Sequence, residues 1–115
     1  MGARVSVVII TRDRVDELVV TLDHLLALPE RPPVIVVDND SRDATAATVR
    51  ERFPEVVLLS PRTNLGAAGR NLGVAAAQTP YVAFADDDSW WEPGALCRAV
   101  HVLDAHPRLA LLALL

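Results

Sequence analysis

The chain has 115 residues, of which 51% are hydrophobic and 23% charged, so it can form one domain with a core and is too apolar to be disordered. The formal net charge is -4, lysine is absent and no basic run stands out, which argues against binding of nucleic acid. The single cysteine, Cys97, excludes an intramolecular disulfide and a cysteine-based zinc site. We expect no signal peptide, because the start of the chain lacks a separate apolar region and a cleavage site. We expect no transmembrane segment, because the longest apolar run, 109–115, is too short to cross a bilayer.

Strand and helix patterns alternate along the chain. Short apolar runs rich in β-branched residues predict buried strands at 5–10, 34–37, 56–59 and 81–85. Apolar spacing, capping residues and prolines predict helices at 15–26, from Ser41 or Asp43 to about 52, at about 67–77 and at about 93–105. Residues 109–115 are expected to begin a fifth strand. Strands that are apolar on both faces and alternate with amphipathic helices are typical of a parallel sheet covered on both sides.

We therefore predict a single α/β domain over residues 1–115, with a Rossmann-like parallel sheet in the strand order 3-2-1-4. A polar cluster follows each of the first four strands. The clusters are Thr11-Arg12-Asp13, Asp38-Asn39-Asp40, residues 62–66 and Asp86-Asp87-Asp88. The carboxyl ends of parallel strands share one edge of the sheet, and ligands bind in the crevice there. In this strand order, Asp38 and the acidic run would flank Thr11, which predicts a ligand site.

The acidic run Asp86-Asp87-Asp88 predicts a metal site. Adjacent carboxylates raise one another's pKa unless a cation neutralises them. A hard divalent ion, Mg²⁺ or Mn²⁺, prefers oxygen ligands and usually bridges to phosphates. The alternative is a solvated turn before the helix that follows. Of the neighbouring Trp90 and Trp91, we expect one to lie in the core and the other at the rim.

Two further segments allow a functional and a structural interpretation. Gly66, Gly69 and Gly73 would let the backbone approach a ligand closely, with Arg70 adding a positive charge; the alternative is a plain loop and a tightly packed helix. The carboxylate and amide in 38–41 can bind the edge of a base and its ribose. The same residues could instead form only a turn with a helix cap.

In the order and spacing of these motifs, the chain resembles the family 2 glycosyltransferases, whose catalytic domain has the GT-A fold. The matching segments are 5–14, 36–43, 64–73, 84–88 and 93–96. The resemblance implies a UDP-, GDP- or dTDP-linked sugar donor and a bound Mg²⁺ or Mn²⁺. It places Thr11, Asp38 and Asn39 around the base and ribose, and Gly66 and Arg70 along the nucleotide pocket. It makes Asp86 and Asp88 the metal ligands of an Asp-x-Asp motif and turns Asp87 toward the ribose or the donor sugar. The metal would stabilise the leaving diphosphate.

The chain also departs from the family pattern. Arg12-Asp13 replaces an aromatic-asparagine pair, and Asp40 replaces a small residue, commonly glycine. Family members continue into an acceptor-binding half that carries the general base of an inverting transfer, whereas this sequence stops inside the predicted fifth strand. We therefore expect an incomplete sheet, a donor-binding half and no identifiable catalytic base.

Two alternatives remain. One is a truncated, non-catalytic nucleotide-binding module that associates through the exposed C-terminal strand. The other is a sugar-phosphate nucleotidyltransferase, which ranks third because no glycine follows the first strand. The sequence does not identify the acceptor. The expected location is the cytoplasm, either free or peripheral at the inner face of the cytoplasmic membrane.

Overall fold

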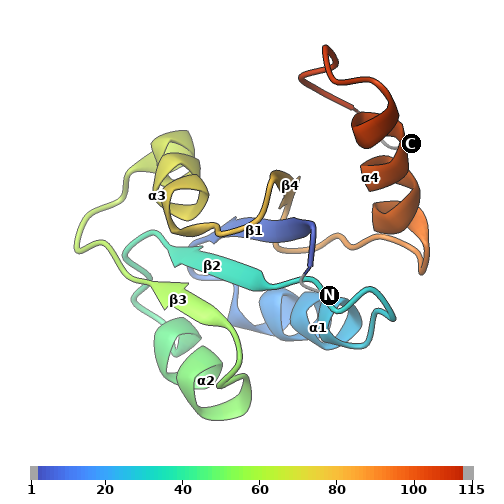
Figure 1. Cartoon of the computed structure of the whole chain (residues 1–115). Helices are drawn as coiled ribbons and strands as arrows, with labels where there is room; N and C mark the ends of the chain where they lie inside the picture. The colour runs from blue at the N-terminus through green and yellow to red at the C-terminus, as the bar shows by residue number, and fades with distance from the viewer. Residues whose placement is uncertain (1–2, 113–115) are drawn as a thin grey trace.

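The computed structural model describes residues 3–112 and contains a four-stranded parallel sheet in the order β3-β2-β1-β4 (Figure 1). The strands are β1 (Val5–Thr11), β2 (Val34–Asp38), β3 (Val57–Leu59) and β4 (Tyr81–Ala85). All three strand pairings are parallel. The predicted fold class and strand order are confirmed.

Helices cover both faces of this sheet, as Figure 1 shows. The helices are α1 (Val15–Leu26), α2 (Thr45–Arg52), α3 (Gly69–Ala76), which follows the 3-10 turn η1 (Gly66–Ala68), and α4 (Ala95–Ala105). α1 and α2 lie on one face and α3 on the other. Every residue of β2 is buried, which explains why residues 34–37 are apolar without alternation.

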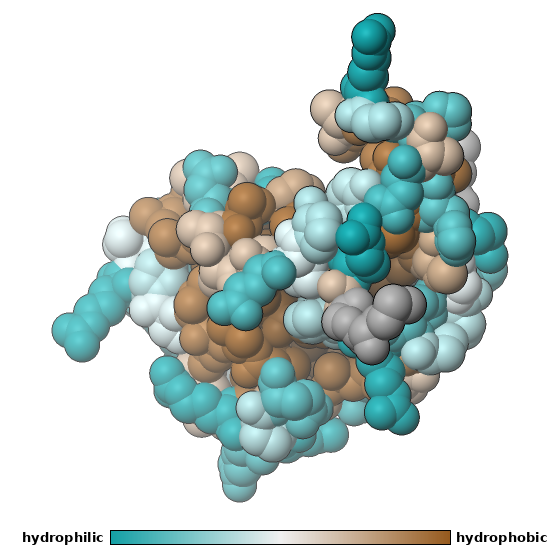
Figure 2. Space-filling model, in the orientation of Figure 1, coloured by the Kyte–Doolittle hydropathy of each residue, from teal (hydrophilic) through white to brown (hydrophobic). Residues whose placement is uncertain are grey.

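The main core lies between the sheet and the α1–α2 layer. Leu18, Leu22 and Leu25 of α1 are fully buried because their helical spacing puts them on one stripe. They pack in one cluster with Val7, Ile9, Val34 and Val36, the alternate residues of β1 and β2 that face this layer. In the same orientation, Figure 2 shows apolar side chains over the sheet and mainly hydrophilic ones at the periphery.

On the opposite face, glycines bring α3 directly onto the central strands. A Cβ atom at Gly73 would lie 2.3 Å from Cγ1 of Val8, so a larger residue does not fit without movement. Gly69 packs similarly against Val37 and Asn39. The close approach expected at the glycine-rich segment is therefore a helix–sheet contact, and it fixes the loop before α3 over the ends of β1 and β2.

The last helix, α4, projects from the rest of the molecule beyond β4 (Figures 1 and 2). Only Ala95 and Leu96 of this helix are buried. At its start, the Glu30 carboxylate accepts a hydrogen bond of 2.9 Å from the Gly94 amide. Near its end, Asp104 accepts hydrogen bonds of 2.6 Å from both Arg4 and the Tyr81 hydroxyl. Polar contacts at its two ends thus help to anchor this helix.

Two expectations need correction. Residues 109–112 form no strand, and the remainder of the predicted fifth strand, 113–115, lies outside the described residues. Because a strand needs a partner edge, an apolar run alone does not make one, and association through an exposed strand at 109–112 has no structural basis. The second helix begins at Thr45 after Ala44, rather than with Ser41 or Asp43 as its cap. No helix within residues 3–112 is both long and apolar enough to cross a membrane.

Candidate functional site

The candidate site is built on the carboxyl ends of β1 and β2, which end side by side. Thr11 and Asp38 are register partners, and the Asn39 amide donates a hydrogen bond of 2.9 Å to the Thr11 carbonyl. The side chains of all three residues are almost wholly buried. Backbone pairing therefore holds Thr11, Asp38 and Asn39 together at the edge where we expected a ligand.

Asp87 brings the acidic run to the same edge. The Thr11 hydroxyl donates a hydrogen bond of 3.0 Å to Oδ2 of Asp87, and the Thr21 hydroxyl of α1 donates one of 2.8 Å to the Asp87 backbone carbonyl. Asp87 is 9% exposed, whereas Asp86 and Asp88 are both exposed. The middle carboxylate is thus an inward-facing anchor, and its two neighbours remain accessible at the rim.

A cation already lies beside this run. Nε of Arg14 is 2.9 Å from Oδ1 of Asp87, and Nη2 of Arg14 is 3.3 Å from Oδ2 of Asp88. The hydrogen bond and charge of Asp87 raise the pKa of the Arg14 guanidinium. Sequence reasoning expected a neutralising cation here but missed Arg14, because the side chain lies 73 residues from Asp87 along the chain.

Asn39 faces the loop between β3 and α3. Its Nδ2 donates a hydrogen bond of 3.1 Å to the Gly66 carbonyl, and its Oδ1 accepts one of 3.3 Å from the Leu65 amide. A Cβ atom at Gly69 would lie 3.1 Å from the same Oδ1. The side chain that we expected near the base and ribose is therefore already engaged in holding this loop against β2.

Gly66 lies on that loop, and Arg70 lies on the first turn of α3. Gly66 has a φ of 57° and no atom within 4 Å of the place where a Cβ would be, so backbone conformation rather than crowding favours glycine there. The Arg70 guanidinium lies 5.8 Å from the centroid of the half-exposed Phe84 ring of β4. Within residues 3–112, Arg70 makes no hydrogen bond or ion pair with the acidic run, so the structure places it above β4 and apart from Asp86–Asp88.

A second set of contacts joins the loops that follow β1 and β2. Oδ1 of Asp13 accepts hydrogen bonds from the amides of Arg42 (2.6 Å) and Asp43 (3.2 Å), while the Asp13 amide donates to Oγ of Ser41 (2.9 Å). Burial raises the pKa of Asp43, but hydrogen bonds from Thr45 and the Val15 amide outweigh it and leave that pKa lowered. These contacts brace the two loops that present the rim residues.

Asp13 and Asp40, two of the departures from the family pattern, have positive φ angles of 53° and 59°. Asparagine and glycine tolerate this left-handed backbone best, and aspartate tolerates it better than most other residues. The usual family residues at these positions thus have a backbone explanation. Both residues carry a carboxylate, and that of Asp13 accepts the hydrogen bonds between the loops.

The donor set at the rim suits a hard divalent ion completed by phosphate. Within residues 3–112, no group of three or more His, Cys, Asp or Glu side chains is placed to hold a metal by itself. Mg²⁺ in phosphate sites commonly uses only one or two carboxylates, with substrate phosphates and water completing its shell. Asp86 and Asp88 supply two exposed carboxylates, and the Arg14 guanidinium already stands where positive charge is favourable.

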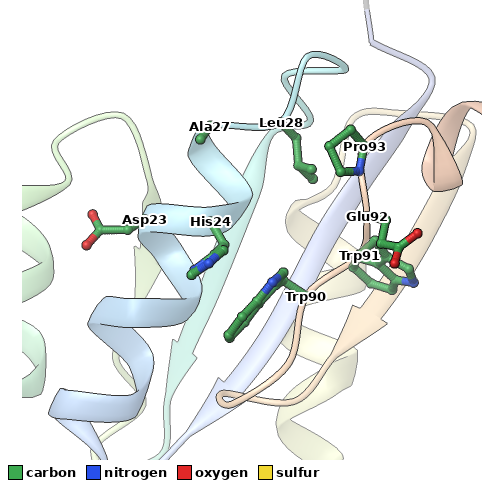
Figure 3. A pocket seen from close by; sticks show the side chains of 8 residues that line it. All are labelled: Asp23, His24, Ala27, Leu28, Trp90, Trp91, Glu92 and Pro93. Carbon is green, nitrogen blue, oxygen red and sulfur yellow. The ribbon is translucent and has the colours of Figure 1, made fainter.

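A separate apolar pocket of about 470 Å³ lies between the end of α1 and the segment before α4 (Figure 3). The Trp90 ring stacks on His24 with centroids 3.8 Å apart, and it remains 42% exposed. Trp91 packs against the main core. Trp91 is thus the tryptophan nearer the core, as expected for one of the two, whereas Trp90 lies at this pocket, none of whose lining residues belongs to the strand-end rim.

Comparisons with known proteins identify the family of the chain. The family model of glycosyl transferase family 2 matches residues 6–114. The uncharacterized glycosyltransferase Rv0539 of Mycobacterium tuberculosis is 42% identical over 80 residues, which cover 70% of this chain and 36% of that protein. The chain thus spans about a third of the length of the curated relatives it matches.

Solved structures share this fold, among them two complexes with a nucleotide or a nucleotide sugar. The mannosyltransferase PcManGT of Pyrobaculum calidifontis, in complex with GDP-Man and Mn²⁺, is 27% identical with a TM-score of 0.77, and the match covers 87% of this chain and 32% of that one. S. aureus TarS 1-349, in complex with UDP, is 25% identical with a TM-score of 0.70, covering 90% of this chain and 33% of that one. The fold is GT-A-like, and the family match covers nearly the whole chain. The chain belongs to glycosyl transferase family 2.

Proposed function

We propose that this chain binds the nucleotide-sugar donor of an inverting glycosyltransferase, with Mg²⁺ or Mn²⁺ shared between the acidic run and the donor diphosphate. The observation that carries the proposal is the Thr11–Asp87 hydrogen bond beside the Thr11–Asp38 register pair, which brings three strand ends to one rim. Binding of GDP-Man with Mn²⁺ by one structural neighbour, and of UDP by another, supports a nucleotide diphosphate as the ligand.

The proposed roles follow from exposure and donor chemistry. Asp38 and Thr11, both almost wholly buried, would form the floor beneath the base and ribose, and Gly66 and Arg70 would line the nucleotide pocket from the facing loop. Asp86 and Asp88 would hold the ion, because both carboxylates are exposed at the rim. Asp87 and Asn39 would contribute chiefly by fixing the acidic run and the glycine-containing loop, since hydrogen bonds within the protein already engage their side chains.

The metal ion would stabilise the negative charge that develops on the leaving diphosphate. An inverting transfer also needs a general base within reach of the acceptor hydroxyl, and we assign that role to no residue of this chain. We extend the proposal neither to the donor sugar nor to the acceptor, because the chain spans only about a third of the length of the relatives it matches.

Calorimetric titration with UDP, GDP and dTDP, each with and without Mn²⁺, tests the proposal. We expect metal-dependent binding of at least one nucleotide. Asp88→Asn should weaken that binding at least about tenfold, in line with the effect of disturbing a metal's ligand shell. Glu51→Gln, which removes the same charge from an exposed position on α2, is the matched control and should leave binding unchanged.

If all three nucleotides fail to bind with Mn²⁺ present, the proposal is wrong. Equal losses in the Asp88 and Glu51 variants would remove the metal role from the acidic run. Nucleotide binding without any sugar transfer by the whole protein would favour the non-catalytic alternative. Release of pyrophosphate from a nucleoside triphosphate and a sugar phosphate would favour the nucleotidyltransferase.

A further inference from the structure

Arg14 is the side chain that pairs with the acidic run. Of the three ion pairs found in residues 3–112, two are made by its guanidinium, one with Asp87 and one with Asp88. The planar guanidinium can contact two carboxylates at once, which the single ammonium of a lysine does less well. Arg14 thus joins the buried and the exposed member of the acidic run.

The surroundings hold this arrangement in place. The Arg14 carbonyl accepts the hydrogen bond of the Leu18 amide (3.0 Å), so its backbone is fixed at the start of α1. Asp87 is fixed at three atoms: one carboxylate oxygen by Arg14, the other by Thr11, and the backbone carbonyl by Thr21. Among the residues that the structure describes, the Asp88 side chain makes only the longer hydrogen bond of 3.3 Å, and it is exposed. The ion pair between Arg14 and Asp87 is therefore a fixed part of the fold. The ion pair between Arg14 and Asp88 is the one that a bound ion can replace.

We propose that Arg14 is a built-in counter-cation that makes the acidic run a poor site for a free divalent ion and a good one for an ion arriving with a diphosphate. This inference rests on the proposed function. A divalent ion on Asp88 would lie close to the guanidinium, and two positive charges at that distance repel each other. The negative charge of a diphosphate offsets this repulsion, so the ion and the nucleotide bind better together than separately. Arg14 is thus a positioning residue that couples the two ligands.

The test measures binding of Mn²⁺ alone, by calorimetry or by the electron paramagnetic resonance signal of free Mn²⁺. Arg14→Gln removes the charge and should tighten Mn²⁺ binding by about fivefold or more, the lower end of usual coupling strengths. The factor by which UDP or GDP tightens Mn²⁺ binding should fall correspondingly. If Arg14 only stabilised the loop, the same variant would loosen the acidic run and bind Mn²⁺ no better than the unmodified chain.

Arg12→Gln is the matched control. It removes the same charge two positions earlier on the same loop, and Arg12 is exposed and forms no ion pair with any other residue in 3–112. We expect its Mn²⁺ affinity and coupling factor to equal those of the unmodified chain. An equal gain in both variants would mean that general charge, rather than the position of Arg14, decides the affinity, and would overturn the inference.

Circular dichroism shows whether Arg14→Gln folds. If it does not, Arg14→Lys is the variant that tests the inference. Lysine preserves a charge for Asp87 but loses the two-carboxylate contact. We expect Mn²⁺ to bind this variant more tightly than the unmodified chain, by less than the gain expected for glutamine. A folded lysine variant with unchanged or weaker Mn²⁺ binding would overturn the inference. Failure of the unmodified chain to bind nucleotide would refute the proposed function. The Mn²⁺ affinities of the unmodified chain and the Arg14 variants, measured without nucleotide, would still test the role of Arg14.

Discussion

Replacing Asn39 by aspartate should destabilise the protein in a way that acid reverses. Asn39→Asp keeps the side-chain shape and the oxygen that accepts from the Leu65 amide, but it replaces the nitrogen that donates to the Gly66 carbonyl over 3.1 Å. A carboxylate oxygen would then face a carbonyl oxygen at a site that is 3% exposed. An unpaired buried carbonyl costs about 1–3 kcal/mol. With the added cost of burying a charge, we expect a loss of about 2–4 kcal/mol at neutral pH.

The pH dependence follows from the sign of the pKa change. Burial beside a carbonyl should raise the folded-state pKa of the introduced carboxyl above its unfolded value. The protonated form is compatible with the fold and can donate to Gly66, so the loss of stability should be smallest below the unfolded pKa. It should grow as the pH rises through the folded pKa. Urea unfolding at several pH values, followed by circular dichroism and compared with the unmodified chain, measures this difference.

Asn64→Asp provides the matched control. It makes the same chemical change in the same loop at an exposed residue, whose Oδ1 accepts a hydrogen bond of 2.9 Å from the Gly66 amide and can continue to do so. We expect a change within about 0.5 kcal/mol, as for most surface substitutions. Equal stability of the two variants, or a deficit at Asn39 that does not shrink on acidification, would refute the assignment of Asn39 as the residue that holds the loop.

Two further predictions concern the contacts of α3 and α4. Gly73→Ala should cost about 1–3 kcal/mol because its Cβ would meet Val8. If this clash causes the loss, thermal unfolding should show that adding Val8→Ala recovers part of the lost stability. A hydrogen bond from Tyr81, and a smaller contribution from the one donated by Arg4, lower the pKa of Asp104. The Asp104 carboxylate therefore stabilises the fold above its unfolded-state pKa, and this stabilisation is lost as the pH falls through its folded-state pKa. Asp104→Asn should therefore be less stable than the unmodified chain at neutral pH and equally stable in acid; a difference that persists in acid would contradict this origin.

The sheet could be predicted because its strongest signals are local. The β-branched runs that became β1 and β2 are buried on both faces, which only a covered parallel sheet explains. The predicted fifth strand shows the limit of such signals. Residues 109–112 are as apolar as a strand, yet strand formation also requires a partner edge, and a local pattern does not specify one.

The same limit separates what could be predicted of the site from what could not. Strand order alone places Thr11, Asp38 and the acidic run on one rim, because the ends of parallel strands meet there. The repulsion among adjacent carboxylates indicated a nearby cation, but it could not distinguish a metal ion from the side chain of Arg14. Likewise, the inward direction of Asn39 depends on where the loop before α3 lies, which no local pattern specifies.

The most direct test of the proposed function is a crystal structure of this chain with Mn²⁺ and whichever of UDP, GDP or dTDP binds. We predict the base and ribose beside Thr11 and Asp38, and a single Mn²⁺ ion bound both by diphosphate oxygens and by a carboxylate of Asp86 or Asp88. A nucleotide bound elsewhere on the molecule, or a diphosphate whose metal ion makes no contact with the acidic run, would contradict it.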